Sequence, residues 1–485
     1  MSERTDYESK RWQALALLCI AQFMVVLDAS IVNIALPTIG EALDFSQDDL
    51  SWVVNAYVLT FGGFLLLGGR LADLLGRRRV FMSGLVLFAL ASLAGGFAQS
   101  DIQLVVARAI QGLGAAIVSP AALSIITVTF KEGAERNKAL GAWGAVAGSG
   151  GAVGVLLGGV LTESLGWEWV LWVNVPIGIV AALIAPRLIA ESRSEGEKRS
   201  FDIPGAVTIT AGLSLLVYAI VNAEKAGWGS TETIVLLGVA AGLIVAFAAI
   251  EQRTADPLVP FRIFRLPTLT GANAVGVLVG ASLFSMFFFA SLYMQQVLGY
   301  GAIKAGLSYL PLSAGIIISA GVSSQLSTRI GFKPVLVTGL VFIAVALLWW
   351  AQVSPDGNYV SDILGPSVIA AIGLGLAFVS ITIAAVAGVK EHESGLASGL
   401  INTSQQVGGA LGLAILATIA NSVSDDKLAT ATSPAEQGAA LTDGFQQAFL
   451  TGAGFAILGL IVCLVLIKTS DSKAMIDREV PAAGA

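Results

Sequence analysis

The sequence predicts an all-α polytopic membrane protein, and two observations carry this prediction. Only 12% of the residues are charged and 55% are hydrophobic, whereas about 25% of a soluble domain is charged. In addition, apolar runs recur along the whole chain, and each is long enough to cross the bilayer core, which takes roughly 20 residues. These runs do not alternate like the strands of a membrane barrel, so we predict that each forms a helix.

The chain is predicted to cross the membrane fourteen times, because fourteen apolar runs reach spanning length. The first run is too long for a signal-peptide core and lacks a small-residue cleavage site, so we expect it to be a retained helix. The expected spans are 12–36, 50–69, 80–98, 103–130, 138–162, 169–190, 203–223, 233–250, 268–292, 303–325, 334–352, 363–388, 395–420 and 447–468.

The orientation follows from the basic residues. If the N-terminus is inside, nearly all of the 27 lysines and arginines lie in or beside the inner segments. The exceptions are Lys225, Lys304 and Lys427 near the outer loops, and Arg108 inside the fourth span. Cytoplasmic loops carry such an excess of basic residues. We therefore predict that both termini are cytoplasmic.

Several function classes are excluded by composition and motifs. The net charge of −6 does not favour nucleic-acid binding. The single histidine, His392, is predicted to be a loop residue, and Cys19 and Cys463 are predicted to be packing residues rather than a disulfide. No nucleophile–base set, metal-ligand spacing or phosphate-binding glycine loop occurs in the sequence. We therefore expect no enzyme, no metal and no cofactor, and a transport process would have to use an ion gradient.

A dense charged stretch links the second and third spans. Gly69 to Arg79 contains four arginines, one aspartate and two glycines. Charges this close to hydrocarbon need partners at the membrane surface. We predict that the stretch forms a cytoplasmic gate, with the following candidate residues: Gly69, Asp73, Gly76, Arg77 and Arg78.

The charged stretch is repeated, with changes, in the second half of the chain. Residues 324–335 align with residues 69–80 at a constant offset of 255, which pairs Gly76 with Gly331 and Asp73 with Thr328. Two parallel repeats are the architecture of many secondary transporters, with the binding site between them. Asp73 and Arg108 of the first half have the uncharged counterparts Thr328 and Ile369 in the second half. We therefore expect the first half to couple transport to ions and the second half to favour substrate.

Two charged residues, Asp28 and Arg108, lie deep within spans. A charged, unpaired carboxylate at Asp28 would cost several kcal/mol in the bilayer, so we predict that Asp28 carries a proton. Arg108 shares a helix face with Gln111 and is predicted to take part in the coupling. The alternative for both charged residues is a structural role that only ties helices together.

Other candidates are less specific. The glycine-rich fifth span suggests helices that slide or hinge at close range, or simply static packing; its candidate hinge positions are Gly148, Gly154, Gly158 and Gly159. Aromatic and polar residues could contact an apolar ligand, although bulk facing lipid would explain the aromatic residues equally well. The candidate substrate contacts are Asn33, Gln111, Phe284, Phe288, Tyr293, Asn402 and Gln405.

Taken together, the motifs resemble the major facilitator superfamily, and specifically its fourteen-span drug–proton antiporter branch. Residues 27–37 are similar to the branch's first-span signature, and residues 167–178 are similar to the beginning of its sixth span. The stretch from Gly69 to Arg79 is similar to the gating motif of the superfamily. Residues 108–116 are similar to the fourth-span motif that is linked to proton coupling. Two positions depart from the pattern: Val155 replaces a proline of the antiporter motif, and Glu168 replaces a basic residue.

This resemblance implies a major facilitator fold with two six-helix halves, 1–190 and 268–485, and a central insertion, 191–267, that holds two additional helices. A long outer loop is expected near 421–446. The implied function is proton-coupled export of lipophilic drugs or antibiotics across the bacterial plasma membrane by a monomer, whose partners are the substrate, protons and membrane lipids. The alternatives are a dedicated exporter of one endogenous metabolite, siderophore or lipid precursor, and a non-transporting membrane sensor.

Overall fold

The computed structural model describes residues 9–45, 50, 52–192, 202–254, 257–390 and 393–477. Within these ranges the chain is helical and contains no β-strand. Thirteen helices are long and apolar enough to cross a membrane, and α6 (Ala134–Ser164), which bends by 43°, brings the number to fourteen if it counts as one span. The predicted all-α membrane fold is therefore confirmed. His392 lies outside the described residues.

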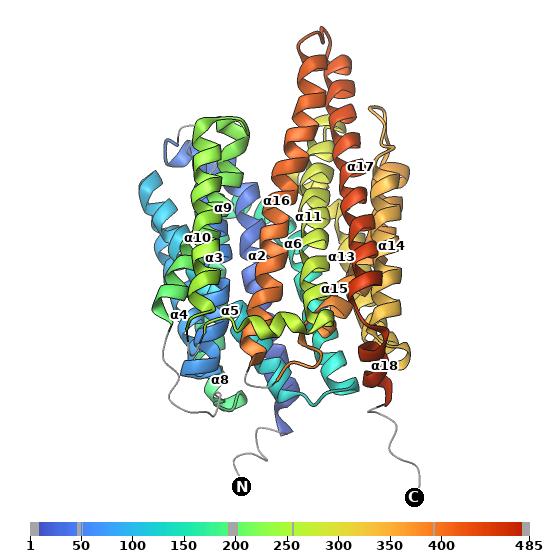
Figure 1. Cartoon of the computed structure of the whole chain (residues 1–485). Coiled ribbons are helices and arrows are strands. Elements are labelled where there is room, and N and C mark those ends of the chain that lie inside the picture. The colour runs from blue at the N-terminus through green and yellow to red at the C-terminus, as the bar shows by residue number, and fades with distance from the viewer. Residues whose placement is uncertain are drawn as a thin grey trace, which may run out of the picture.

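The first group of helices comprises residues 9–192. The helices α3, α4 and α5 pack against one another, while α2 packs on α6 and α8 (Figure 1). Their bounds are α2 Arg11–Ala42, α3 Trp52–Leu75, α4 Arg77–Gly96, α5 Asp101–Thr129, α6 Ala134–Ser164, α7 Trp169–Trp172 and α8 Asn174–Leu188.

The second group begins at Pro267. The pairs α11–α16, α14–α15, α13–α15 and α16–α17 form its main contacts. Its elements are α11 Pro267–Leu292, η2 Tyr293–Val297, α12 Ala302–Ser308, α13 Leu310–Ile330, α14 Phe332–Trp350, η3 Tyr359–Leu364, α15 Gly365–Val386, α16 Ser394–Leu428, α17 Pro434–Leu466 and α18 Thr469–Asp477.

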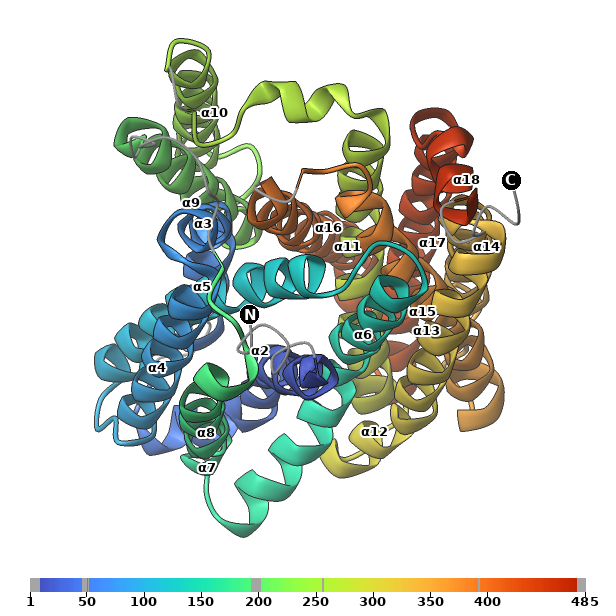
Figure 2. The same ribbon diagram turned by 90° about the horizontal axis from the view of Figure 1, so that it is seen from below.

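Two further helices lie between these groups in sequence, as the sequence predicts. They are α9 (Ile203–Ala226) and α10 (Thr231–Glu251), and the 3₁₀ turn η1 (Phe261–Arg265) follows them. Helix α9 packs against both α3 and α16, so it bridges the two groups, whereas α10 packs mainly on α9 (Figure 2). Few side chains of α10 are buried in the protein, as expected for a helix that faces lipid.

The structure corrects the prediction of a long outer loop, because the segment 421–446 is a helical hairpin. Helix α16 continues to Leu428, and α17 begins at Pro434 with a Ser433–Glu436 capping box. The hairpin projects beyond the other helices in Figure 1. The error arose because polar helical turns that leave the apolar region carry no hydrophobic signal, although a capping box stabilises the start of a helix.

The charged stretch was predicted to link two spans, but most of it is helical. Helix α3 continues to Leu75, and α4 begins at Arg77, so only Gly76 separates them. Gly76 has a φ of 109°, and Gly331, its partner in the repeat, has a φ of 85° between α13 and α14. Both turns require a left-handed backbone that glycine adopts readily. The two copies therefore share their geometry as well as their sequence.

Candidate functional site

A buried ion pair joins α2 to α5 in the middle of the first group. The Nη1 atom of Arg108 donates to Oδ2 of Asp28 at 2.6 Å. Neither side chain is more than 1% exposed. The helices that carry the site pack closely, since a Cβ at Gly112 of α5 would lie 2.4 Å from the Tyr57 carbonyl oxygen of α3. The two predicted coupling residues therefore contact each other.

Two amides complete the surroundings of the Asp28 carboxylate. Gln111 Nε2 and Asn174 Nδ2 each donate to Oδ1 of Asp28 at 2.8 Å. The same two nitrogen atoms approach Ser92 Oγ at 3.0 and 3.2 Å, and Ser92 donates to the Leu171 carbonyl at 2.7 Å. Donors from α5 and α8, with Ser92 of α4 behind them, thus surround the carboxylate of α2 and supply the hydrogen bonds that a buried carboxyl group needs.

Arg108 has partners besides the carboxylate. Its Nε donates to the Val53 carbonyl oxygen at 3.0 Å, and Nη1 also donates to Gln111 Oε1 at 2.8 Å. The guanidinium carbon lies 4.4 Å from the centre of the Tyr57 ring, a distance typical of a cation–π contact. The arginine would therefore remain held if Asp28 were protonated. This arrangement suits a carboxylate that gains and loses a proton while the cation stays in place.

A second ion pair lies where α3 meets α4, within the charged stretch. Arg77 Nη2 donates to Asp73 Oδ1 at 2.7 Å, and both side chains are buried. The Asp73 carboxylate also accepts from the backbone N–H groups of Gly395 and Leu396, each at 3.2 Å. These N–H groups begin α16, where the helix dipole favours a negative charge. Asp73 therefore joins the first group of helices to the second.

The arginines of the charged stretch have two kinds of partner. Arg77 reaches Ser124 Oγ at 2.8 Å and Ser394 Oγ at 3.2 Å, so it too bridges α5 and α16. Arg78 and Arg79 instead lie 3.7 and 3.6 Å from Glu191 Oε2 in the same group of helices. Among these charged side chains, it is therefore Asp73 and Arg77 that contact the second group.

The backbones of α3 and α16 approach closely beside this pair. A Cβ at Gly69 would lie 2.4 Å from the Gly395 carbonyl oxygen, and a Cβ at Gly395 would lie 2.5 Å from the Gly69 carbonyl oxygen. Such distances leave no room for a side chain. Gly69 therefore has a packing role in the predicted gate.

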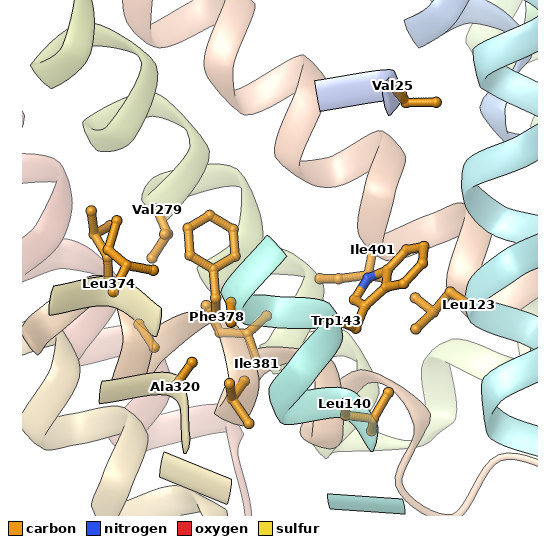
Figure 3. Close-up of a cluster of buried hydrophobic side chains, with 14 of the residues drawn as sticks. Val25, Leu123, Leu140, Trp143, Val279, Ala320, Leu374, Phe378, Ile381 and Ile401 are labelled. Atoms are coloured by element: carbon orange, nitrogen blue, oxygen red, sulfur yellow. The ribbon is translucent and has the colours of Figure 1, made fainter. Parts of the chain in front are cut away.

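Apolar side chains of both groups close the same end of the bundle. Figure 3 shows Trp143 and Leu123 of the first group near Ile401, and Phe378 next to Ile381. All five belong to one cluster of buried hydrophobic side chains. Together with the Asp73–Arg77 contacts, this cluster holds the two groups together at the end where α3 stops and α16 starts.

Comparison with known proteins identifies the family. The sequence profile of the Major Facilitator Superfamily matches residues 18–413. The chain belongs to the Major Facilitator Superfamily. The predicted fourteen-span drug–proton branch fits this assignment and is confirmed by exporters among the relatives.

Two bacterial relatives are similar over most of their length. The cephamycin export protein CmcT of Amycolatopsis lactamdurans is 43% identical and covers 91% of this chain and 90% of its own. The puromycin resistance protein pur8 of Streptomyces alboniger is 38% identical over 96% and 93% of the two chains. The chain is therefore a multi-pass transporter of the bacterial plasma membrane that carries small molecules, and not an enzyme.

The solved structures support the fold. The human organic anion transporter MFSD10 has a TM-score of 0.67 and a sequence identity of 16%, with 93% of this chain and 99% of that chain covered. At this identity the likeness concerns the fold alone. The arrangement of helices described above is therefore that of a major facilitator transporter.

The predicted hinge glycines of this transporter pack against its neighbouring helices. A Cβ at Gly154 would lie 1.9 Å from Ser30 Oγ, and a Cβ at Gly158 would lie 2.6 Å from the Ile31 carbonyl oxygen. Gly159 has more room, with Ile303 at 3.5 Å. The side-chain position of Gly148 lies outside the described residues. The bend of α6 falls between Gly151 and Val153, so Gly154 and Gly158 allow α6 to approach α2 beyond the bend.

We expect Gly154→Ala to destabilise the transporter, because its methyl group would overlap Ser30. Overpacking of this kind costs about 1–3 kcal/mol. Thermal unfolding of the purified protein would measure the change. Gly151→Ala is the matched control, since a Cβ there meets nothing within 4 Å, and equal melting temperatures for the two variants would contradict the predicted close packing.

The candidate substrate contacts are scattered. Gln111 belongs to the Asp28 network, and Tyr293 is buried and donates to the Ser354 carbonyl oxygen at 2.7 Å. Phe288 is 42% exposed on the outside of α11, and the side chain of Phe284 lies outside the described residues. The aromatic residues that the structure describes therefore do not line a common pocket.

The remaining polar candidates lie on two helices, α2 and α16. Asn33 of α2 is exposed and donates to its own helix at the Ala29 carbonyl oxygen. Asn402 of α16 is half-buried, and its Oδ1 accepts from Ser119 Oγ of α5 at 3.4 Å. Gln405 is half-buried beside Gly276 and Gly280 of α11. Asn402 is thus the candidate that lies between the two groups.

Sequence reasoning missed several residues of these networks. Ser92, Asn174 and Tyr57 surround the Asp28–Arg108 pair. Ser124 and Ser394 accept hydrogen bonds from Arg77. Asn174 offered a signal, because an amide within an apolar run needs partners. Serine and tyrosine are too common in spans to be selected without the tertiary contacts.

Proposed function

We propose that this transporter exports lipophilic antibiotics or drugs from the cytoplasm in exchange for protons. The observation that carries this proposal is the buried Asp28–Arg108 pair with its Gln111 and Asn174 partners. In this pair the Asp28 carboxylate can take up a proton, while Arg108 stays held by its other hydrogen-bond partners. The names of the relatives, for export of or resistance to cephamycin and puromycin, support the substrate class.

The proposed cycle alternates between two arrangements of the helix groups 1–190 and 268–485, and α9 and α10 belong to neither. With Asp73 on the start of α16, the cytoplasmic end is closed and Asp28 exchanges protons with the outside. Protonation weakens the Asp28–Arg108 attraction and favours release of substrate to the outside. Moving one charge across 100 mV yields about 2.3 kcal/mol, which supports accumulation against a gradient. The protein would act as a monomer and without a cofactor.

The direct test is transport into everted membrane vesicles that contain the protein. Energised vesicles are acidic inside, so we expect several-fold greater accumulation of at least one lipophilic compound, such as puromycin or ethidium, than in vesicles without the protein. A protonophore should reduce the accumulation to the level of the empty vesicles. Accumulation that survives the protonophore would contradict proton coupling, and no accumulation of any compound in the panel would contradict export.

A dedicated exporter of one compound is the second candidate. It is favoured by relatives that are each named for one antibiotic, cephamycin or puromycin. The same vesicles distinguish the two candidates, because a dedicated exporter would accumulate one member of a chemically diverse panel, whereas a multidrug exporter would accumulate several.

A further inference from the structure

The two groups of helices meet along two seams, and α9 covers one of them. At the seam between α3 and α16, apolar residues of α9 pack into a buried cluster with Leu66 of α3 and Leu396 of α16. A Cβ at Gly63 would lie 2.0 Å from Ser214 Oγ of α9. This seam is therefore closed to lipid along its cytoplasmic half.

The other seam, between α6 and α13, contains an open cavity of about 530 Å³. Figure 2 shows α6 beside α13, away from α9 and α10. At this seam Asn137 Nδ2 donates to Thr328 Oγ1 at 2.9 Å, at the position that the repeat pairs with Asp73. A Cβ at Gly321 would meet nothing within 4 Å, which leaves the wall of α13 hollow. The cavity has the size of a site for a small molecule or an acyl chain.

The cavity combines an apolar wall with a positively charged rim. Its residues are Ala134, Lys138, Gly141, Ala142, Ala145, Ile317, Gly321, Ser324, Gln325, Thr328 and Arg329. Lys138 and Arg329 are exposed, and neither forms an ion pair in the part of the chain that the structure describes. The nearby acids Glu132 and Glu135 are already paired with Arg136 and Arg11. The rim therefore carries unneutralised positive charge.

We propose that this cavity binds one anionic phospholipid of the cytoplasmic leaflet. The loop charges place the rim on the cytoplasmic side, where basic pockets between spanning helices bind anionic headgroups. Lys138 and Arg329 would contact the phosphate, and the Gln325 amide would donate a hydrogen bond to the headgroup. An acyl chain would lie along Ile317, Gly321 and the small residues of α6. This binding site does not depend on the proposed transport cycle.

The test is native mass spectrometry of the purified full-length protein with added phosphatidylglycerol or phosphatidylcholine. We expect phosphatidylglycerol to bind more tightly, and the double variant Lys138→Gln/Arg329→Gln to lose affinity about 30-fold, since each basic residue near an anionic surface contributes roughly a factor of five. The variant Lys138→Arg/Arg329→Lys should retain binding because it retains both charges. Lys131→Gln, an exposed charge outside the cavity, is the matched control.

A second variant tests the cavity rather than its charge. Gly321→Leu should fill the hollow and reduce phosphatidylglycerol binding several-fold, whereas Gly242→Leu, on the exposed face of α10, should leave it unchanged. Equal binding of the two lipids, or full binding by both cavity variants, would overturn the proposal. A Gly321→Leu protein that keeps the lipid but transports substrate with a raised KM would also overturn it, and would assign the cavity to substrate.

Discussion

Asp28→Asn is expected to reduce gradient-driven accumulation in everted vesicles to less than a tenth of the wild-type value. The amide cannot exchange a proton at this position, so the exporter would lose its coupling site. Substrate exchange between the two sides without a gradient requires no net proton movement, and we expect the variant to retain it. Gradient-driven transport that remains at the wild-type level would rule out Asp28 as the proton carrier.

Loss of the Asp28 charge also leaves Arg108 without its anion. Breaking a buried pair by removing one partner costs about 3–5 kcal/mol, so an inactive Asp28→Asn protein could simply be unfolded. The double variant Asp28→Asn/Arg108→Gln removes both charges and should restore thermal stability without restoring coupling. If coupling returned together with stability, the pair would be structural. Ile20→Ala is the control, because Ile20 lies on the same helix and is 50% exposed.

The Asp28 site shows what the sequence could predict and what it could not. Asp28, Arg108 and Gln111 were predictable because charged and amide groups within hydrocarbon require partners. That these three contact one another depends on how α2 crosses α5, which no local pattern encodes. Ser92 and Tyr57 become part of the site only through that crossing.

The fold, too, could be predicted from the sequence only in part. Apolar length predicted the spans because the bilayer sets the length of a helix, but it could not follow α16 and α17 beyond the membrane. Asp425, Lys427 and Asp443 therefore indicated a loop, although Lys427 and Asp443 form an ion pair between two helices. The role of α9 could not be predicted either, since an apolar helix shows no preference for the seam that it covers.

The second large effect is expected from a substitution of Asp73 in the predicted gate. Asp73 accepts hydrogen bonds from the first N–H groups of α16 and from Arg77. Hydrogen bonds to charged groups contribute about 1.5–3 kcal/mol each. Asp73→Asn would weaken three of them and place an amide N–H against other donors. We therefore expect the population with an open cytoplasmic end to increase at least tenfold and net export to fall correspondingly.

Labelling of a buried cysteine measures this opening. Ser398 lies on the first turns of α16 and is fully buried. The variant Ser398→Cys would be made in a protein in which Cys19 and Cys463 are replaced by serine. On everted vesicles, this cysteine should react slowly with an impermeant thiol reagent. Adding Asp73→Asn should accelerate labelling at least tenfold. Arg79→Gln is the control, because Arg79 is 74% exposed and approaches Glu191 rather than α16. Equal acceleration by both substitutions would mean that charge density, and not the contact of Asp73 with the start of α16, holds the end closed.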